Sequence, residues 1–428
     1  MESQSTKLKK HKTLFDEFTR SLRPLITKSK HKRHCHKLTD EEWVETGILR
    51  TIFQEPSGRG FLQTLPAMGR KLLKRTHFFE TLNSGRRLRL CQDVNNLLLD
   101  QLSSSLSHAD PLKEYPELAG FDVYAGDGHY HAAPVHEKKK GGKKYPTLHF
   151  YSLDIRTHGL SHLTIADTSD DRKKEHDMRA LKRLSLKELR KNAPKGRKVI
   201  HIWDRAGIDF QQWYKWKKSG GVYFISREKK NMRLSTIADL DIDRTSPINN
   251  GVDSYELVGP ANGAAISRIK YTCAMTGQSF TFLTNLATNI PPGLIAYLYK
   301  MRWDIEKVFD QVKNKMNEKK AWAKSDIAKS MQAGFVCLAH NLMLLLEDRL
   351  ERKEGVVNKV EAKRKAKRLY ETAKKIHEDG KDLPICFLKA TRFTQRSVKL
   401  IRWLRNNIFK LTSWQAAVGY LRLVYEDF

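Results

Sequence analysis

Residues 297–316 read YLYKMRWDIEKVFDQVKNKM, and the interpretation of the whole chain starts from this stretch. At 3.6 residues per turn its apolar side chains fall on one side of a helix. They are Leu298, Met301, Ile305, Val308, Val312 and Met316. The spacing therefore predicts a single amphipathic helix whose apolar stripe is buried.

A second strip of the same predicted helix carries charged and polar groups. Tyr299, Arg302, Glu306 and Lys313 follow one another at offsets that place all four within roughly 60° of each other around the helix. A carboxylate beside a phenol, a guanidinium and an ammonium suits a site that holds a metal ion against a phosphate. The alternative is that Arg302 and Glu306 form an ordinary i,i+4 ion pair on a solvated face.

The composition points to a polyanionic partner. The 428 residues include 79 Lys+Arg against 48 Asp+Glu, a formal net charge of +31. Nucleic acid is the usual partner of so basic a chain.

A hydrophobic content of 40% and eight tryptophans indicate a folded protein. No run of eighteen apolar residues is present, so the sequence predicts no membrane span. The five widely spaced cysteines favour free thiols in a reducing compartment.

Three regions differ in pattern. Residues 1–112 read as a basic helical domain, and residues 1–37 alone carry eleven Lys or Arg against three acids, which favours contact with DNA over a solvated arm. Residues 113–320 alternate strands and helices, with a β-rich insertion at about 230–290. Residues 321–428 are helical again. Within them, residues 353–375 carry nine Lys or Arg and form either a solvated helix or a second DNA-facing surface.

Two aspartates stand where predicted strands end. Residues 121–125 run into Gly126-Asp127-Gly128, and residues 198–203 end at Asp204. Open α/β sheets place their sites at the carboxyl ends of strands. Each aspartate also has a structural interpretation, because Asp between glycines is a common tight-turn signature and Asp204 could cap the following helix.

Three acids that converge, Asp127, Asp204 and Glu306, repel one another unless a cation is present. Two divalent ions held by them could activate a water or a 3′-hydroxyl for phosphodiester chemistry, and Mg²⁺ fits ligands that are all oxygen.

These motifs together resemble a known family. The pattern Tyr-x2-Arg-x3-Glu-x6-Lys, met by Tyr299, Arg302, Glu306 and Lys313, is similar to the YREK signature of DDE transposases of the insertion-sequence-four type. The contexts of Asp127 and Asp204 resemble the first and second catalytic aspartates of that family. The β-rich stretch between Asp204 and Glu306 resembles the family's insertion into a ribonuclease-H-like core. The resemblance covers about residues 115–320.

The resemblance implies a fold, an activity and a set of partners. The fold class is α/β: a ribonuclease-H-like mixed sheet with helices and a β-rich insertion, flanked by helical N-terminal and C-terminal regions. The activity is DNA cleavage and strand transfer, by cut and paste, at the terminal inverted repeats of a mobile element. The partners are double-stranded DNA, as transposon ends and target, and a second copy of the chain in a homodimer on paired ends, with no membrane involved. The location is the bacterial cytoplasm, at the nucleoid.

The resemblance also assigns roles to individual residues. Asp127, Asp204 and Glu306 would be the catalytic metal ligands for Mg²⁺, with Mn²⁺ as a substitute. Tyr299, Arg302 and Lys313 would contact phosphates at the cleaved end. The helical residues 1–112 would bind the inverted repeats.

Two other interpretations stay open at this point. One is a domesticated DNA-binding protein that has lost catalysis, and the other is a nuclease or resolvase on the same core. A nuclease releases free DNA ends, whereas a transposase joins them to a target. A basic RNA-associated protein is less favoured, because it would have no need for the three acids.

Overall fold

The computed structural model describes most of the chain. The described residues are 12–35, 37–53, 57–135, 144–166, 177–190, 193, 196–259, 264–274, 276–316, 320–380, 398–410 and 412–426. Among the helices of these residues, none combines the length and the apolarity needed to cross a membrane.

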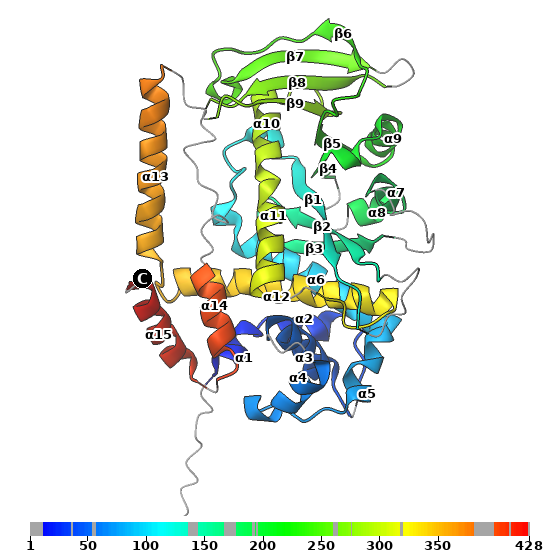
Figure 1. Ribbon diagram of the computed structural model, residues 1–428, viewed down its shortest axis with the longest axis vertical. Coiled ribbons are helices and arrows are strands. Elements are labelled where there is room, and N and C mark those ends of the chain that lie inside the picture. The colour runs from blue at the N-terminus through cyan, green and yellow to red at the C-terminus, as the bar shows by residue number, and fades with distance from the viewer. Residues whose placement is uncertain are drawn as a thin grey trace, which may run out of the picture.

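A nine-stranded mixed sheet forms the centre of the molecule (Figure 1). Its strands are β1 Phe121–His131, β2 Thr147–Asp154, β3 Leu160–Ile165, β4 Lys198–Ile202, β5 Val222–Arg227, β6 Ser235–Asp239, β7 Val252–Gly259, β8 Ile266–Thr272 and β9 Ser279–Thr284. Their order across the sheet is β3-β2-β1-β4-β5-β9-β8-β7-β6. Strands β2 and β3 form an antiparallel hairpin, and β4 and β5 both run parallel to β1. The first five strands are the core of the predicted ribonuclease-H-like fold.

The β-rich insertion extends this sheet instead of forming a separate one. Strand β9 pairs antiparallel with β5, and β8, β7 and β6 follow outward. Strand β6 was not expected from the sequence; all five of its residues are exposed, so it lacks the alternation that would have marked it. With this insertion and the flanking helices, the predicted α/β fold class is confirmed.

Helices cover both faces of the central strands. One face packs against α7 Asp177–Lys182, α8 Leu186–Leu189 and α9 Phe210–Gly220 and carries a cluster that includes Phe150, Trp203 and Phe224. The other face belongs to a larger cluster that runs from Leu14 to Leu421. Helices α10 Pro292–Met301 and α11 Trp303–Asp310 cross this second face, and α12 Asp326–Arg352 runs between the sheet and the N-terminal helices (Figure 1).

The N-terminal and C-terminal regions are helical, as predicted. The N-terminal helices are α1 Leu14–Phe18, α2 Leu22–Lys28, α3 Asp40–Ile52, α4 Gly58–Thr64, α5 Arg75–Phe78 and α6 Gly85–Ser105, with short 3₁₀ turns η1 Pro66–Met68, η2 Glu80–Asn83, η3 Ser107–Ala109 and η4 Pro116–Leu118. Helix α12 packs on α3, α6 and β3, so its buried apolar side chains join the N-terminal helices to the sheet. After α12 come α13 Lys359–Glu378, α14 Val398–Asn407 and α15 Trp414–Glu426. Helix α13 stands apart from α10 and α11 (Figure 1). Most of its described side chains are exposed.

The single helix predicted over residues 297–316 is interrupted. Helix α10 ends at Met301, and the N–H of Arg302 bonds to the carbonyl of Tyr299, which tightens the turn before α11 begins. A π-helical segment, η7 Gln311–Lys315, then follows α11. The predicted apolar stripe is nevertheless buried throughout. Part of the predicted polar strip is retained, because Arg302 contacts Glu306 and lies over the ring of Tyr299. Lys313 lies in the π-helical segment, where the helical pitch changes. Tyr299 and Arg302 are buried, whereas Lys313 is exposed.

The tight turn considered for Gly126-Asp127-Gly128 is absent from the structure, because β1 continues straight through these residues to His131. A Cβ atom on Gly126 would lie 2.3 Å from the ring of Trp203, and one on Gly128 would lie 2.8 Å from Leu148. The two glycines therefore flank Asp127 to make room for packing on the opposite face of the strand.

A buried histidine in β4 makes stability depend on pH. His201 lies between the rings of Tyr124 and Phe224, and burial lowers its pKa to about 4, although a hydrogen bond with the Leu189 carbonyl opposes the shift. In the unfolded chain His201 binds a proton below its ordinary pKa of 6.5, whereas the folded protein keeps it neutral down to about pH 4. Burial of the neutral ring therefore adds no cost to the free energy of unfolding above pH 6.5, and stability is lost as the pH falls from 6.5 towards 4. Lowering the pH from 7 to 5 should cost about 2 kcal/mol of the free energy of unfolding through His201 alone.

The measurement is denaturant unfolding of the wild type and His201→Phe at pH 7 and pH 5. The variant keeps a ring between Tyr124 and Phe224 and cannot titrate, so it should lose about 2 kcal/mol less than the wild type over this interval. Equal losses in the two proteins would show that His201 does not carry the effect.

Candidate active site

The two aspartates are brought together by the parallel pairing of β1 and β4. Val123 pairs with Ile200 and Ala125 pairs with Ile202, and Asp127 and Asp204 each lie two residues further on. Because side chains alternate between the faces of a strand, both carboxyl groups extend from the face that packs against α11. Neighbouring strands lie about 4.8 Å apart, which places the two aspartates side by side at the end of the paired region.

Asp204 also has the structural role considered for it. It caps the 3₁₀ turn η5 Arg205–Gly207, where its Oδ1 accepts a hydrogen bond from the N–H of Ala206 at 2.9 Å. Its carbonyl oxygen accepts a hydrogen bond from the hydroxyl of Ser226 in β5 at 2.7 Å. These bonds hold the backbone around Asp204 in place, and neither of them involves its Oδ2.

Arg302 joins the strand to the helix at the centre of the site. Its Nη1 contacts Oδ2 of Asp127 at 3.0 Å, and its Nη2 contacts Oε1 of Glu306 at 2.6 Å. The arginine side chain is 9% exposed, against 22% for Asp127 and 32% for Glu306. The i,i+4 pair expected on a solvated face is thus present, but it is largely buried and includes a carboxylate 175 residues away in sequence.

The negative charges of the three carboxylates act on one another. Burial raises the pKa of Asp127 to about 6; Arg302 and the Gly128 N–H oppose the rise, while Asp204 and Glu306 add to it. The repulsion means that the three carboxylates are close enough to interact. The buried guanidinium partly compensates them, and its own pKa is raised by Tyr299, Asp127 and Glu306 against the effect of burial.

A group of cations and an aromatic ring lies beside the carboxylates. Tyr299 is 8% exposed, and its ring is tilted against that of Phe282 with centroids 5.0 Å apart. Burial raises the pKa of its phenol, so it stays a hydrogen-bond donor at neutral pH. Burial, Arg205 and Arg302 lower the pKa of Arg227 at the end of β5, which places these three cations near one another. Trp303, beside Arg302, leaves 56% of its surface exposed.

Lys313 lies on the side of the site where His129 is found. Lys313 is exposed in the π segment η7. Burial of the His129 ring lowers its pKa to about 4, and the positive charge of Lys313 contributes to this shift. His129 follows Asp127 on the same face of β1 and stacks on Phe309 of α11, with ring centroids 4.9 Å apart. Lys313 is therefore near the strand of Asp127.

The three acids fit a hard divalent cation by their chemistry, because all the donors are carboxylate oxygens and burial favours a compensating charge. Among the residues that the structure describes, no group of three or more His, Cys, Asp or Glu side chains is arranged around a common metal position. The geometry explains this finding. The guanidinium of Arg302 lies between Asp127 and Glu306 and turns both carboxylates towards itself.

Sequence reasoning found the three acids, Tyr299 and Arg302, but it missed Arg205 and Arg227. Arg205 directly follows Asp204, and Arg227 ends β5, the strand next to β4. Their position at the carboxyl ends of parallel strands was a signal in the sequence that the basic composition of the chain obscured.

Comparison with known protein families gives a match over the central part of the chain. The model of the transposase DDE domain family matches residues 120–342, which include the sheet, α10, α11 and α12 up to Leu342. No curated protein matches the chain. The insertion-sequence-four subtype stays a prediction. The match covers more than half of the 428 residues and spans all three acids, and the chain belongs to the transposase DDE domain family.

Proposed function

We propose that this protein cuts DNA at the terminal inverted repeats of a mobile element and joins the freed ends to a target. The observation that carries the proposal is the bridge from Arg302 to Asp127 and Glu306, next to Asp204. The bridge joins two carboxylates to one buried cation, and the pairing of β1 with β4 brings Asp204 to the same end of the paired strands. The formal charge of +31 supports a DNA substrate.

In this proposal each residue has a distinct task. Asp127, Asp204 and Glu306 hold Mg²⁺, or Mn²⁺ in its place. The bound ions would activate the attacking hydroxyl and stabilise the leaving oxygen. Arg302, Arg227 and Arg205 bind the phosphate and oppose its charge, and the Tyr299 phenol donates a hydrogen bond to it. Lys313 contacts a neighbouring phosphate. The exposed ring of Trp303 offers a face on which a base can stack.

The flanking regions take part through DNA contact and pairing of ends. We assign terminal-repeat binding to residues 1–112, where Arg20 and Arg23 expose 54% and 83% of their side chains. The helices of residues 321–428 complete the fold, and α13, whose described side chains are mostly exposed, is a solvated helix in this proposal. A homodimer would hold two ends together for cut-and-paste transfer, in the bacterial cytoplasm at the nucleoid where its DNA lies.

The test uses labelled DNA fragments that span both borders of the gene's own flanking sequence. The purified full chain should cleave them at defined positions when Mg²⁺ is added, and EDTA should abolish the cleavage. Defined binding without any cleavage would instead favour the domesticated DNA-binding protein.

Arg302 gives this proposal a test that does not depend on DNA. Replacing it with glutamine removes the charge between Asp127 and Glu306, so the carboxylates repel one another without compensation. Arg302→Gln should melt below the wild type in EDTA, and Mn²⁺ should raise its melting temperature more than that of the wild type. In the wild type the ion must displace a guanidinium that the variant lacks.

The measurement is a thermal melt with and without Mn²⁺. Arg302→Lys is the matched control, because it keeps a positive charge and should respond to Mn²⁺ like the wild type. An equal Mn²⁺ response in Arg302→Gln and the wild type would show that the ion does not bind between these carboxylates.

A further inference from the structure

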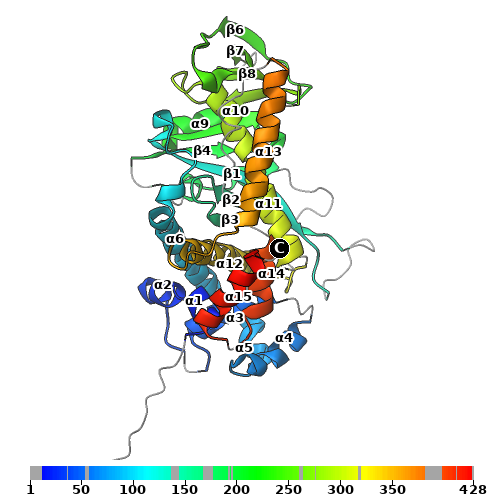
Figure 2. The ribbon, with the colours of Figure 1, turned by 90° about the vertical axis from the view of Figure 1, so that its left-hand side faces the viewer.

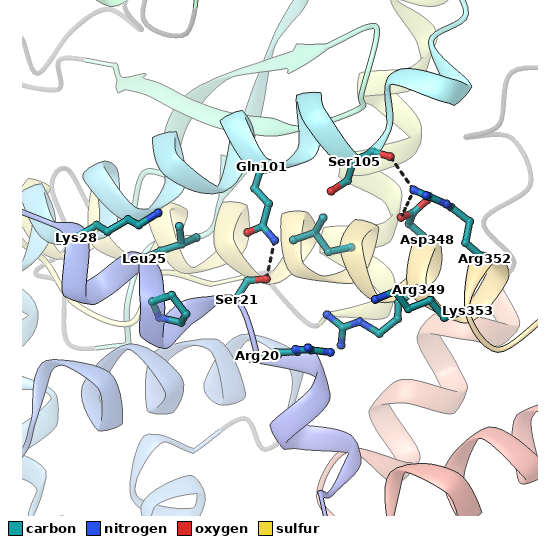
Figure 3. Close-up of a pocket in the computed structure, with 12 residues that line it drawn as sticks. Arg20, Ser21, Leu25, Lys28, Gln101, Ser105, Asp348, Arg349, Arg352 and Lys353 are labelled. Carbon is teal, nitrogen blue, oxygen red and sulfur yellow. Dashed lines mark hydrogen bonds and ion pairs between the residues drawn. The ribbon is translucent and has the colours of Figure 1, made fainter.

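A second polar site lies away from the three acids. A pocket of about 570 Å³ opens between α2, α6 and the end of α12 (Figure 3). Figure 2 places α2 and α6 on the side of the molecule away from α10 and α11. The pocket shares no residue with the candidate active site. Its volume falls in the range that holds small ligands, roughly 300–1,000 Å³.

The lining of this pocket is strongly cationic. Five cations border it against one acid, Asp348, and they are Arg20, Lys28, Arg349, Arg352 and Lys353. Asp348 contacts Arg352 at 3.5 Å and His108 at 3.6 Å, so its charge is already shared. The pocket therefore keeps an excess of positive charge within a small volume.

A buried glutamate holds two of these arginines in place. Glu17 is 6% exposed, and its Oε2 contacts Nη1 of Arg349 at 2.7 Å and Nη1 of Arg20 at 3.6 Å. Lys12 reaches its other oxygen at 3.8 Å. One carboxylate thus faces three cations. Burial lowers the pKa of Arg349 and the charge of Arg20 lowers it further, whereas Glu17 and Asp348 oppose the shift.

The remaining lining is polar on one side and apolar on another. Gln101 of α6 donates a hydrogen bond to the hydroxyl of Ser21 at 3.1 Å, and Arg352 donates one to the carbonyl of Ser105 at 3.2 Å (Figure 3). Pro24, Leu25 and Leu345 supply an apolar wall. A ligand that fits this pocket has an anionic end for the arginines and a less polar body for the wall.

We propose that this pocket binds the phosphate of a nucleotide, either within DNA or as a free nucleotide. Arginine guanidinium groups match phosphate oxygens in geometry and charge, and Glu17 and Asp348 hold three of them before the ligand arrives. The apolar wall accommodates the sugar or base. This site is independent of the carboxylates and needs no metal ion.

The test compares two double variants of the full chain in EDTA, so that phosphate held through metal at the carboxylates does not contribute. Arg20→Gln with Arg352→Gln removes two pocket cations whose side chains are 54% and 55% exposed, which spares the core. Lys367→Gln with Lys374→Gln, on α13, removes the same charge at exposed positions elsewhere. Arg349 is left intact, because its bond to Glu17 supports the fold.

The probes are ADP, followed by calorimetric titration, and a 12-base-pair duplex, followed by fluorescence anisotropy over a series of salt concentrations. The pocket variant should bind at least one of these probes about tenfold or more weakly than the α13 variant. Loss of ADP binding with unchanged DNA binding identifies a free nucleotide as the ligand. Loss of DNA binding, with a reduced salt slope, identifies a phosphate of the DNA backbone.

Two results would overturn the proposal. One is a wild-type protein that binds neither probe under these conditions. The other is an equal loss of binding in the pocket variant and the α13 variant, because that loss would follow from net charge and not from the pocket.

Discussion

Glu306→Gln is expected to reduce metal-dependent DNA cleavage by about a thousandfold or more, because a metal site stabilises the transition state by several kcal/mol. Glutamine has the same size and lacks the charge that would bind the ion. Its amide oxygen can still accept the hydrogen bond from Nη2 of Arg302, so the position of α11 is retained. The measurement is the initial rate of cleavage of border DNA at saturating Mg²⁺.

The matched control is Glu117→Gln in the 3₁₀ turn η4. This glutamate is exposed, so the same change of charge should leave both the rate and the melting temperature near those of the wild type. Binding of border DNA by Glu306→Gln should be largely unchanged, since the variant loses an acid and no cation. A near-normal cleavage rate would reduce Glu306 to a structural partner of Arg302.

Gly126→Ala should have the largest effect on stability, about 3 kcal/mol, with loss of activity as a consequence. A Cβ atom here would lie 2.3 Å from the ring of Trp203, which is 1% exposed and has no space to retreat. Either the ring or strand β1 must shift, and Asp127 and Asp204 are the next residues along the two strands. The free energy of unfolding in denaturant measures the effect.

Gly120→Ala provides the comparison for this prediction. Gly120 lies just before β1, and no atom comes within 4 Å of a Cβ placed there. The control should therefore stay within about 0.5 kcal/mol of the wild type. If Gly126→Ala were equally mild, the packing of Trp203 on β1 would not be what sets the distance between the aspartates.

The meeting of Asp127 and Asp204 could be predicted from the sequence. Asp127 lies within β1 and Asp204 lies just after β4, and both fall in the same alternation as the buried residues before them. If the two strands pair in parallel, only their register decides whether the two carboxyl groups lie together. In the structure Ala125 pairs with Ile202, and this register places them together. The inference worked because strand periodicity is local and strict.

The sequence did not predict where the helix of residues 297–316 changes its pitch. A helical wheel assumes constant pitch, and here the chain tightens at Arg302 and widens into a π segment after Asp310. Neither change coincides with a proline or a glycine, so the sequence carries no sign of it. The buried apolar stripe was predicted correctly because burial of a hydrophobic face tolerates modest changes in angle.

The contacts that define the site could not be predicted. The ion pair of Arg302 with Asp127 joins residues 175 positions apart, and it depends on how α11 packs across the sheet. The cationic group around Arg227 likewise forms only when β5 lies beside β4. Such contacts follow from tertiary packing, on which neither composition nor spacing carries information.

Strand joining tests the central claim most directly. The full chain would be given border DNA with a free 3′-hydroxyl, a supercoiled target plasmid and Mg²⁺, and the products would be sequenced across the new junctions. The account predicts border DNA covalently joined to the plasmid, and no joined product with Glu306→Gln. Cleavage of the border without any joined product, under conditions in which the ends remain bound, would contradict a transposase and indicate a nuclease on the same fold.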